Sequence, residues 1–236
     1  MSDGAYLLEL GTVPYLEAWD LQRSLAGAVS QGAVPETVIF LEHAPVVTLG
    51  RRTDAQELHV PDDAEVDVVE TNRGGKSTFH GPGQLVCYPI LDLRRHGKDV
   101  KKYVRDLEEA LIRTLAQVDL SGARFEGLTG VWLHPPPRKI ASIGVHISRW
   151  ITTHGYALNV DLDPAPFTDW ITACGLEDAA FTTIARELGR PVTVDEVRPV
   201  ARDAIADVFE LELEPLPADD GAGLWKQPVH SRLSAG

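Results

Sequence analysis

The sequence predicts an α+β fold, a mixed sheet flanked by helices, from the arrangement of its strand and helix patterns. Short apolar runs typical of strands occur at 6–10, 37–42, 46–50, 66–70, 85–90, 130–133, 139–147 and 155–160. Helical patterns occur at only three places, about 15–30, 99–118 and 193–210. Strands and helices therefore do not alternate regularly, as a doubly wound sheet would require.

Length and composition indicate one soluble domain. The chain has 236 residues, 44% of them hydrophobic, which is enough for one sizeable core. We expect a single domain over 1–214 and a tail over 215–236, rich in Pro, Gly and Ala, whose last residues are mobile. No run approaches the ~20 apolar residues of a membrane span, and the N-terminus has an acid where a signal peptide has basic charge. Two cysteines, Cys87 and Cys174, are too few for a disulfide framework, so we expect a cytoplasmic protein.

Apolar spacing and capping residues define the three helices. The first is indicated by Leu16, Trp19, Leu25 and Val29. In the second, apolar positions recur every three or four residues at Val100, Tyr103, Val104, Leu107, Leu111, Leu115 and Val118. The third opens at Thr193, because Thr193 and Glu196 have capping-box spacing, and ends near Glu210. Pro199 inside it removes a helical hydrogen bond, so we expect a kink or a late start there.

The formal net charge of −13 argues against broad binding to nucleic acid or anionic membranes, which requires a clustered cationic surface. One segment departs from this balance. Six basic residues crowd into 94–105 with only Asp99 opposing them: Arg94, Arg95, Lys98, Lys101, Lys102 and Arg105. Two interpretations stay open, a solvated helix face or a docking patch for an acidic partner.

The segment RGGKSTFHGPGQ, residues 73–84, resembles a phosphate-binding loop only superficially. A P-loop needs a glycine at position 70, where the chain has Glu70, and a following helix, which Gly81–Gly83 prevents. Its glycines, Gly74 and Gly75 among them, leave backbone that a ligand can approach closely. With Arg73 and His80 the segment either lines a binding site or forms two tight hairpin turns in which His80 bonds a local carbonyl.

Two further side chains are candidates for chemistry. Cys174 stands before Gly175 in a turn-like setting, where a thiol is accessible and neighbouring amides can reach an oxyanion. Such a thiol needs a base or cation nearby, and Lys139, at the start of the strand 139–147, can supply one. The alternatives are an inert thiol and an exposed lysine. Cys87, within a strand, is interpreted as a buried core residue.

Four blocks of the chain together resemble the octanoyltransferases, also called lipoate-protein ligase B. They are RGGKSTFHGPGQLVCYPILDL at 73–93, GVWL at 130–133, KIASIGVHISRWITTHGYALNV at 139–160 and ACGL at 173–176, and LEHAPVVTLGRR at 41–52 also fits. The resemblance covers roughly residues 5–210. It implies the fold of biotin and lipoate ligases, class II synthetase-like, and transfer of octanoate from acyl carrier protein to a lysine of a lipoyl domain.

The resemblance also implies particular roles for residues. Cys174 and Lys139 would form a catalytic dyad. Substrate-binding positions would be Arg73, Gly74, Gly75, His80, Ala141, Ser142, Ile143, Gly144, Gly155, Tyr156 and Ala157. Lys76 is expected to be peripheral. Ala173 replaces the proline that usually precedes the family's cysteine, which puts the rigidity of that turn in doubt.

The implied donor is octanoyl-acyl carrier protein, and the implied acceptors are lipoyl domains of 2-oxoacid dehydrogenase acyltransferase subunits and the glycine-cleavage H protein. No cofactor, metal, nucleic acid or membrane is implied. Because carrier proteins and lipoyl domains are typically acidic, the basic run over 94–105 gains interest as a docking patch. Two other functions remain open, an ATP-dependent lipoate or biotin ligase and a non-catalytic acyl-binding relative.

Overall fold

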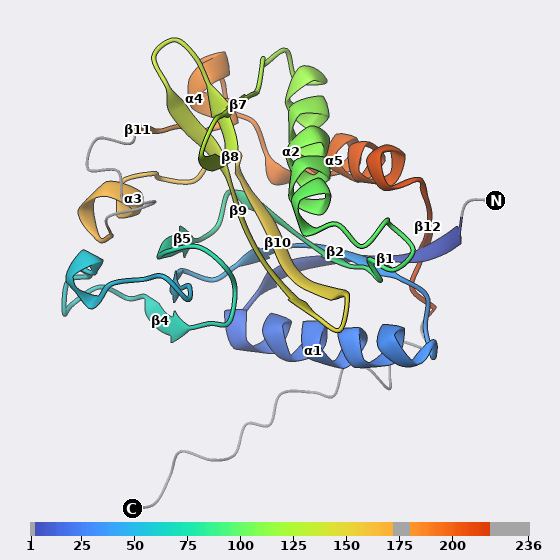
Figure 1. Ribbon diagram of the computed structural model, residues 1–236. Coiled ribbons are helices and arrows are strands. Elements are labelled where there is room, and N and C mark those ends of the chain that lie inside the picture. The colour runs from blue at the N-terminus through green and yellow to red at the C-terminus, as the bar shows by residue number, and fades with distance from the viewer. Residues whose placement is uncertain (1–2, 172–179, 218–236) are drawn as a thin grey trace, which may run out of the picture.

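The computed structural model of the protein describes residues 3–171 and 180–217 (Figure 1). In chain order the elements are β1 (Asp3–Val13), α1 (Tyr15–Gln31), β2 (Thr37–His43), β3 (Val46–Leu49), η1 (Ala55–Glu57), β4 (Asp67–Glu70), β5 (Thr78–His80), β6 (Gln84–Ile90), α2 (Val100–Ala116), β7 (Ala123–Phe125), β8 (Leu128–Leu133), β9 (Arg138–Ser148), β10 (Ile151–Asn159), α3 (Pro166–Asp169), β11 (Ala180–Phe181), α4 (Ile184–Leu188), α5 (Val194–Phe209) and β12 (Leu211–Pro215). No helix within these ranges is both long and apolar enough to cross a bilayer.

A nine-stranded mixed sheet organises the molecule, in the order β12-β1-β2-β6-β10-β9-β8-β7, with β11 paired to β9. β1 runs parallel to both β2 and β12, whereas β2, β6, β10, β9, β8 and β7 pair in antiparallel fashion. The expected mixed sheet flanked by helices is confirmed. β9 and β10 form a long central hairpin that crosses the molecule (Figure 1).

Helices cover both faces of this sheet. Along β2, Val38 and Phe40 face the core formed with α2 and α5, while Ile39 and Leu41 face the core formed with α1. This alternation follows from the two-residue period of a strand. Figure 1 shows α1 on one side of the sheet and α2 with α5 on the other.

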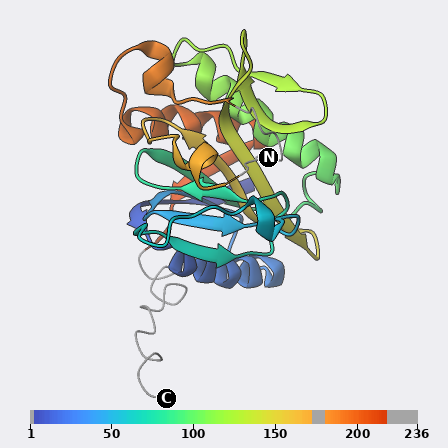
Figure 2. The same cartoon turned by 90° about the vertical axis from the view of Figure 1, so that its left-hand side faces the viewer.

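A second, three-stranded sheet lies beside the large one, in the order β4-β3-β5. Phe79 from β5 and Phe167 from α3 lie edge to face, 6.0 Å between ring centroids, in a separate hydrophobic cluster. Figure 2 shows this sheet turned toward the viewer, in front of the β9–β10 hairpin. The small sheet brings the segment after β4 onto the face of β9.

The predicted helices form with small differences. α1 begins at Tyr15 as expected, but Leu16 is 56% exposed because the buried stripe follows Ala18, Leu21 and Leu25 instead. Asp99 caps α2 by accepting hydrogen bonds from the backbone N–H groups of Lys101 and Lys102.

The third helix, α5, carries the predicted capping box of Thr193 and Glu196. It starts at Val194 and runs through Pro199, so the late start considered above does not occur. β12 was not predicted. Its pairing with β1 extends to Pro215, and residues 218–236 of the expected tail lie outside the described ranges.

Candidate active site

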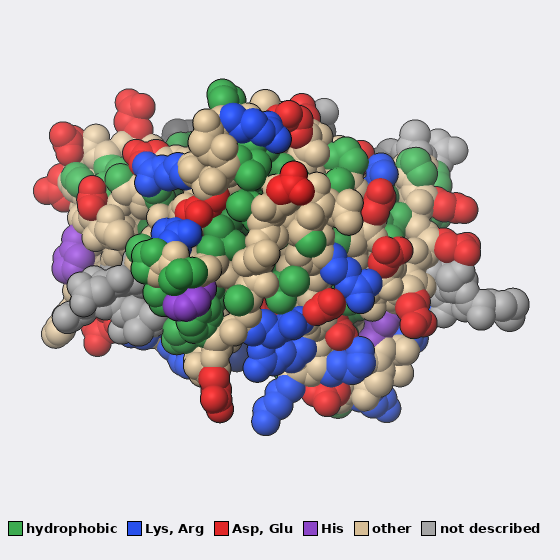
Figure 3. All heavy atoms as spheres, turned by 90° about the horizontal axis from the view of Figure 1, so that it is seen from above, with side chains coloured by type: hydrophobic (Ala, Val, Ile, Leu, Met, Phe, Trp, Pro, Cys, Tyr) green, Lys and Arg blue, Asp and Glu red, His purple; other side chains and the backbone are tan. Residues whose placement is uncertain are grey.

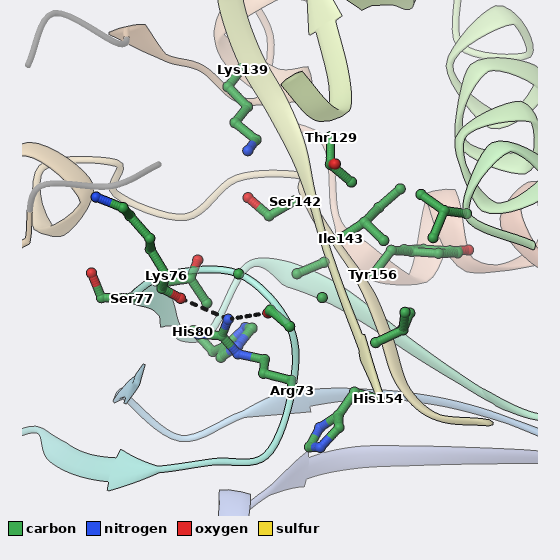
Figure 4. A pocket seen from close by; sticks show the side chains of 18 of the residues that line it. Arg73, Lys76, Ser77, His80, Thr129, Lys139, Ser142, Ile143, His154 and Tyr156 are labelled. Carbon is green, nitrogen blue, oxygen red and sulfur yellow. Dashed lines mark hydrogen bonds between the residues drawn. The ribbon is translucent and has the colours of Figure 1, made fainter. Parts of the chain in front are cut away.

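A cavity of about 410 Å³ lies between the β9–β10 hairpin and the glycine-rich loop that follows β4. Figure 4 shows Lys139 at one end and His154 at the other, with Ser142 and Ile143 of β9 between them. Its walls combine apolar side chains, such as Ile143 and Tyr156, with the backbone of Gly74 and Gly144. An enclosure of this size and mixed lining is the usual form of a small-ligand site.

The glycine-rich loop lies directly on β9. The backbone N–H of Gly74 donates to the carbonyl of Val145 at 2.9 Å. A Cβ at Gly144 would stand only 3.0 Å from the carbonyl oxygen of Gly74 and 3.1 Å from Cδ of Arg73. Gly75 has φ +90, a conformation that side chains disfavour. The glycines therefore permit close backbone approach, as predicted. Part of that space is taken by the contact between the loop and β9 rather than by a ligand.

Arg73 ties this loop to β3. Its side chain is buried, and Nη2 donates to the carbonyl of Thr48 at 2.6 Å while Nε donates to Oγ1 of the same residue at 3.1 Å. Nη1 donates to the carbonyl of Lys76 at 2.7 Å. The guanidinium thus holds the loop in shape while lining the cavity. Lys76, expected to be peripheral, also borders the cavity and forms an ion pair with Glu57.

His80 lies in a buried polar network beside Arg73. Its Nδ1 lies 2.7 Å from Oε1 of Gln84, whose Nε2 donates to Oδ1 of Asn159 at 2.9 Å. Because that amide nitrogen is already a donor, Oε1 accepts and Nδ1 of His80 carries the hydrogen. Burial, followed by nearby His43, holds the pKa of His80 well below its ordinary value. The imidazole is neutral, and its partner is a local carbonyl, that of the Gln84 side chain four residues along the chain.

His154 closes the far end of the cavity and was not predicted as a site residue. It has φ +58 within β10, uncommon for a residue with a side chain. Nε2 lies 2.7 Å from Oδ1 of Asn72 and Nδ1 lies 3.3 Å from the hydroxyl of Tyr15. Burial lowers its pKa to about 3, with a further contribution from the Arg73 charge. The available sequence signal for His154 was its position directly before Gly155. The positive φ of His154 could not be predicted from the sequence.

Lys139 lies in the cavity rather than on the surface. It is only 4% exposed, and Nζ stands 5.3 Å from the centroid of the Trp132 ring on the adjacent strand β8. Gly130 leaves room for the backbone of β9 and for the lysine, since a Cβ there would lie 2.5 Å from the carbonyl oxygen of Ala141 and 3.0 Å from Cε of Lys139. The N–H of Gly130 is held by buried Glu108 of α2 at 3.2 Å. Gly130 and Trp132 fall within the GVWL block, but their packing against the lysine was not predicted.

The remaining predicted positions divide between cavity and core. Ser142, Ile143, Gly144, Gly155, Tyr156 and Ala157 line the cavity with Arg73, Gly74, Gly75, His80 and Lys139. Ala141 is fully buried and packs in the core. At Gly155 a Cβ would meet the carbonyl oxygen of Cys87 at 2.1 Å, so this glycine allows β6 and β10 to approach. Cys174 and Ala173 lie outside the described residues, and the expected dyad is therefore represented by Lys139 alone.

The sequence and the fold match one class of protein. Residues 14–206 match the family described as the lipoyl protein ligase A/B catalytic domain. The chain also resembles a bipartite lipoate protein ligase from Thermoplasma acidophilum, with TM-score 0.74, 16% identity and coverage of 95% of this chain and 91% of that one. The biotin protein ligase of Aquifex aeolicus gives TM-score 0.54 and 13% identity over 88% of this chain and 71% of its own. The predicted biotin/lipoate ligase fold is confirmed.

Sequence similarity identifies the branch of this class. The octanoyltransferase of Mycobacterium tuberculosis H37Rv is 52% identical over 203 residues, which is 86% of each chain. The chain therefore belongs to the octanoyltransferase family, and the resemblance drawn from its sequence blocks is confirmed.

Proposed function

We propose that this protein transfers an octanoyl group from an acyl carrier protein to a lysine of lipoyl domains, in lipoate biosynthesis. The acceptors would be the lipoyl domains of 2-oxoacid dehydrogenase acyltransferase subunits and the glycine-cleavage H protein. The observation that carries the proposal is Lys139, a buried amine at one end of a cavity of about 410 Å³. The protein's two cysteines suit a reducing cytoplasm, where thiols stay unpaired.

The chemistry would proceed in two steps. In the first, Lys139 accepts the thiol proton of Cys174, and the thiolate attacks the carbonyl carbon of the octanoyl thioester. The carrier's thiol leaves with the proton returned by Lys139, and the octanoyl group remains on Cys174 as a new thioester. In the second, the amine of the acceptor lysine attacks this thioester and loses a proton to Lys139. Cys174 leaves as a thiolate and is reprotonated, and the product is an amide.

Intact mass spectrometry tests this scheme. After mixing with octanoyl-carrier, the protein should gain one octanoyl group and lose it again when a lipoyl domain is added. Cys174→Ala should abolish the adduct. Cys87→Ala is the matched control, because that thiol is fully buried in the core and should leave the adduct intact. An adduct that persists in Cys174→Ala would contradict the assigned nucleophile.

The same experiment separates the alternatives. An ATP-dependent ligase would modify the lipoyl domain from free octanoate and ATP and would form no adduct with octanoyl-carrier. A non-catalytic acyl-binding relative would retain the carrier without an adduct or a modified lipoyl domain. Lys139→Met, which keeps an unbranched side chain but removes the amine, should greatly slow adduct formation if the lysine is the base.

A further inference from the structure

A basic surface lies at the N-terminal end of α2 and continues onto the turn between β9 and β10. We define it by Arg94, Arg95, Lys98, Lys101, Lys102, Arg149 and Trp150. The two segments are far apart in the sequence but meet in the fold. The N–H of Leu93 donates to the carbonyl of Trp150 at 2.8 Å, and Asp92 forms an antiparallel bridge with Ile151. They therefore form one continuous surface.

Charge distinguishes the basic surface from the rest of the molecule. Residues 94–105 hold six basic side chains against one acid, in a chain with net charge −13. Arg94 pairs with Asp92 at 2.5 Å and Lys102 with Asp106 at 2.7 Å, so part of this positive charge is neutralised within the chain. Within residues 3–171 and 180–217, no carboxylate lies within ion-pair distance of Lys98, Lys101 or Arg149. Figure 3 shows Lys and Arg side chains gathered toward the lower edge of one face, with some Asp and Glu side chains among them. Lys98, Lys101 and Arg149 are therefore available to pair with the carboxylates of an acidic partner.

The turn at Arg149 and Trp150 has a conformation that neither residue favours. Both φ angles are positive, 51 for Arg149 and 72 for Trp150. Two-residue hairpin turns of this kind prefer Asn-Gly, because side chains strain the left-handed region. Trp150 is nevertheless 38% exposed, and Val100, the first residue of α2, is 44% exposed. Trp and Arg are the residues most enriched at the centres of protein interfaces. An exposed, strained Arg-Trp turn on the same surface as Lys98 and Lys101 has the composition of a docking site.

The basic surface leads away from the catalytic cavity. Val104, one helical turn after Lys101 on α2, lines the cavity that contains Lys139. From Lys139 to Ser148 the strand β9 advances nine residues, about 30 Å at roughly 3.3 Å per residue. A partner seated at the far end of this surface, at Arg149, can bring its reactive group to Lys139 only on a long arm. A lysine side chain is too short, whereas a carrier protein's thioester stands on a long flexible arm.

We propose that the basic surface docks the acidic acyl carrier protein that donates the octanoyl group. This inference rests on the function proposed above and adds the place where the donor binds. Oppositely charged surfaces would speed encounter and orient the carrier, so that its arm enters the cavity beside Val104. The lipoyl domain would approach the cavity from elsewhere.

A double charge reversal, Lys98→Glu with Lys101→Glu, tests the surface. The variant should raise the Kd for octanoyl-carrier, measured without an acceptor present, and the KM for the same donor by at least tenfold. Its rate with an octanoyl thioester of a small thiol, and its KM for the lipoyl domain, should stay within twofold of the parent. The matched control is Arg23→Glu with Arg190→Glu, whose side chains are both 58% exposed but lie on other parts of the molecule.

A second variant separates docking from folding. Trp150→Gly places a residue that tolerates positive φ in the strained turn, so the free energy of unfolding should not fall. Affinity for octanoyl-carrier should still drop about tenfold, because the exposed ring is lost. Unchanged affinity in this variant would remove the turn from the proposed interface.

Two results would overturn the whole inference. If the charge reversal leaves the Kd for octanoyl-carrier unchanged, the basic run is a solvated helix face. If it weakens binding of the lipoyl domain instead, the surface belongs to the acceptor. Failure of the proposed function is distinct from both outcomes, because the parent protein would then form no adduct from the small octanoyl thioester either.

Discussion

Acid should destabilise the folded chain well above the range in which carboxylates titrate, because three imidazoles are buried near the cavity. Burial lowers the pKa of His43 to about 4 and that of His154 to about 3, from an ordinary value of 6.5. The unfolded chain therefore binds protons that the folded chain cannot. The stability from each histidine is fully present above pH 6.5 and is lost as the pH falls toward the folded pKa. At pH 5, His43 and His154 each lower the free energy of unfolding by about 2 kcal/mol. The pKa of His80 is lowered in the same direction.

Urea unfolding measures this loss. The free energy of unfolding of the parent should fall by several kcal/mol between about pH 7.5 and about pH 5, a window in which ordinary carboxylates, with pKa about 4, stay ionised. In His43→Gln, whatever its stability at neutral pH, the fall over the same window should shrink by about 2 kcal/mol. His59→Gln, which removes an exposed imidazole, is the control for replacing a histidine outside the core. A parent stability that is flat between the two pH values would refute the reasoning.

Four other outcomes follow from the cavity walls, one helix and the length of the acyl chain. Gly155→Ala should lower soluble yield and thermal stability sharply, because its Cβ would stand 2.1 Å from the carbonyl oxygen of Cys87. Gly130→Ala has φ +115 and would place a Cβ 2.5 Å from the carbonyl oxygen of Ala141 and 3.0 Å from Cε of Lys139, so it should lower thermal stability and cut kcat for octanoyl transfer at least tenfold. In contrast, Gly27→Ala meets nothing within 4 Å and should raise the free energy of unfolding by up to about 1 kcal/mol. Hexanoyl donors should react about fifteen-fold less efficiently than octanoyl donors, since two methylenes are worth about 1.6 kcal/mol, and equal kcat/KM for both would argue against a closed acyl site.

Local patterns predicted most of the elements correctly. The Thr193 and Glu196 capping box placed the start of α5 at the correct residue, because a cap is a local hydrogen-bond requirement. Apolar periodicity located α2, although Val100 is exposed at its first turn. By contrast, β12 was missed because its Leu-Glu alternation follows a helix directly, and its pairing with β1 joins residues about 200 positions apart.

The site was predictable in its residues but not in its geometry. Rejection of a phosphate loop was possible from Glu70 and the Gly-Pro-Gly segment, and the same glycines indicated close backbone approach. However, the closest approach at Gly144 is to the loop at Gly74, which only the pairing of distant segments reveals. His154 was missed because its role depends on a positive φ. A lysine at a strand start is usually exposed, and the contact of Lys139 with Trp132 on the neighbouring strand, 5.3 Å from Nζ to the ring centroid, cannot be read from the sequence.

The parallel pairing of β1 with β12 also bears on how the chain folds and stays soluble. β1 cannot acquire its outer neighbour until residues near 211 have been synthesised, so its hydrogen-bonding edge remains open for most of translation. Once in place, β12 is itself a poor template for further strands, since it is five residues long, carries Glu212 and Glu214 and ends in Pro215. At the opposite edge β7 has only three residues. A nascent chain stalled before residue 211 would expose β1 and should be prone to edge-to-edge aggregation, which the completed sheet resists.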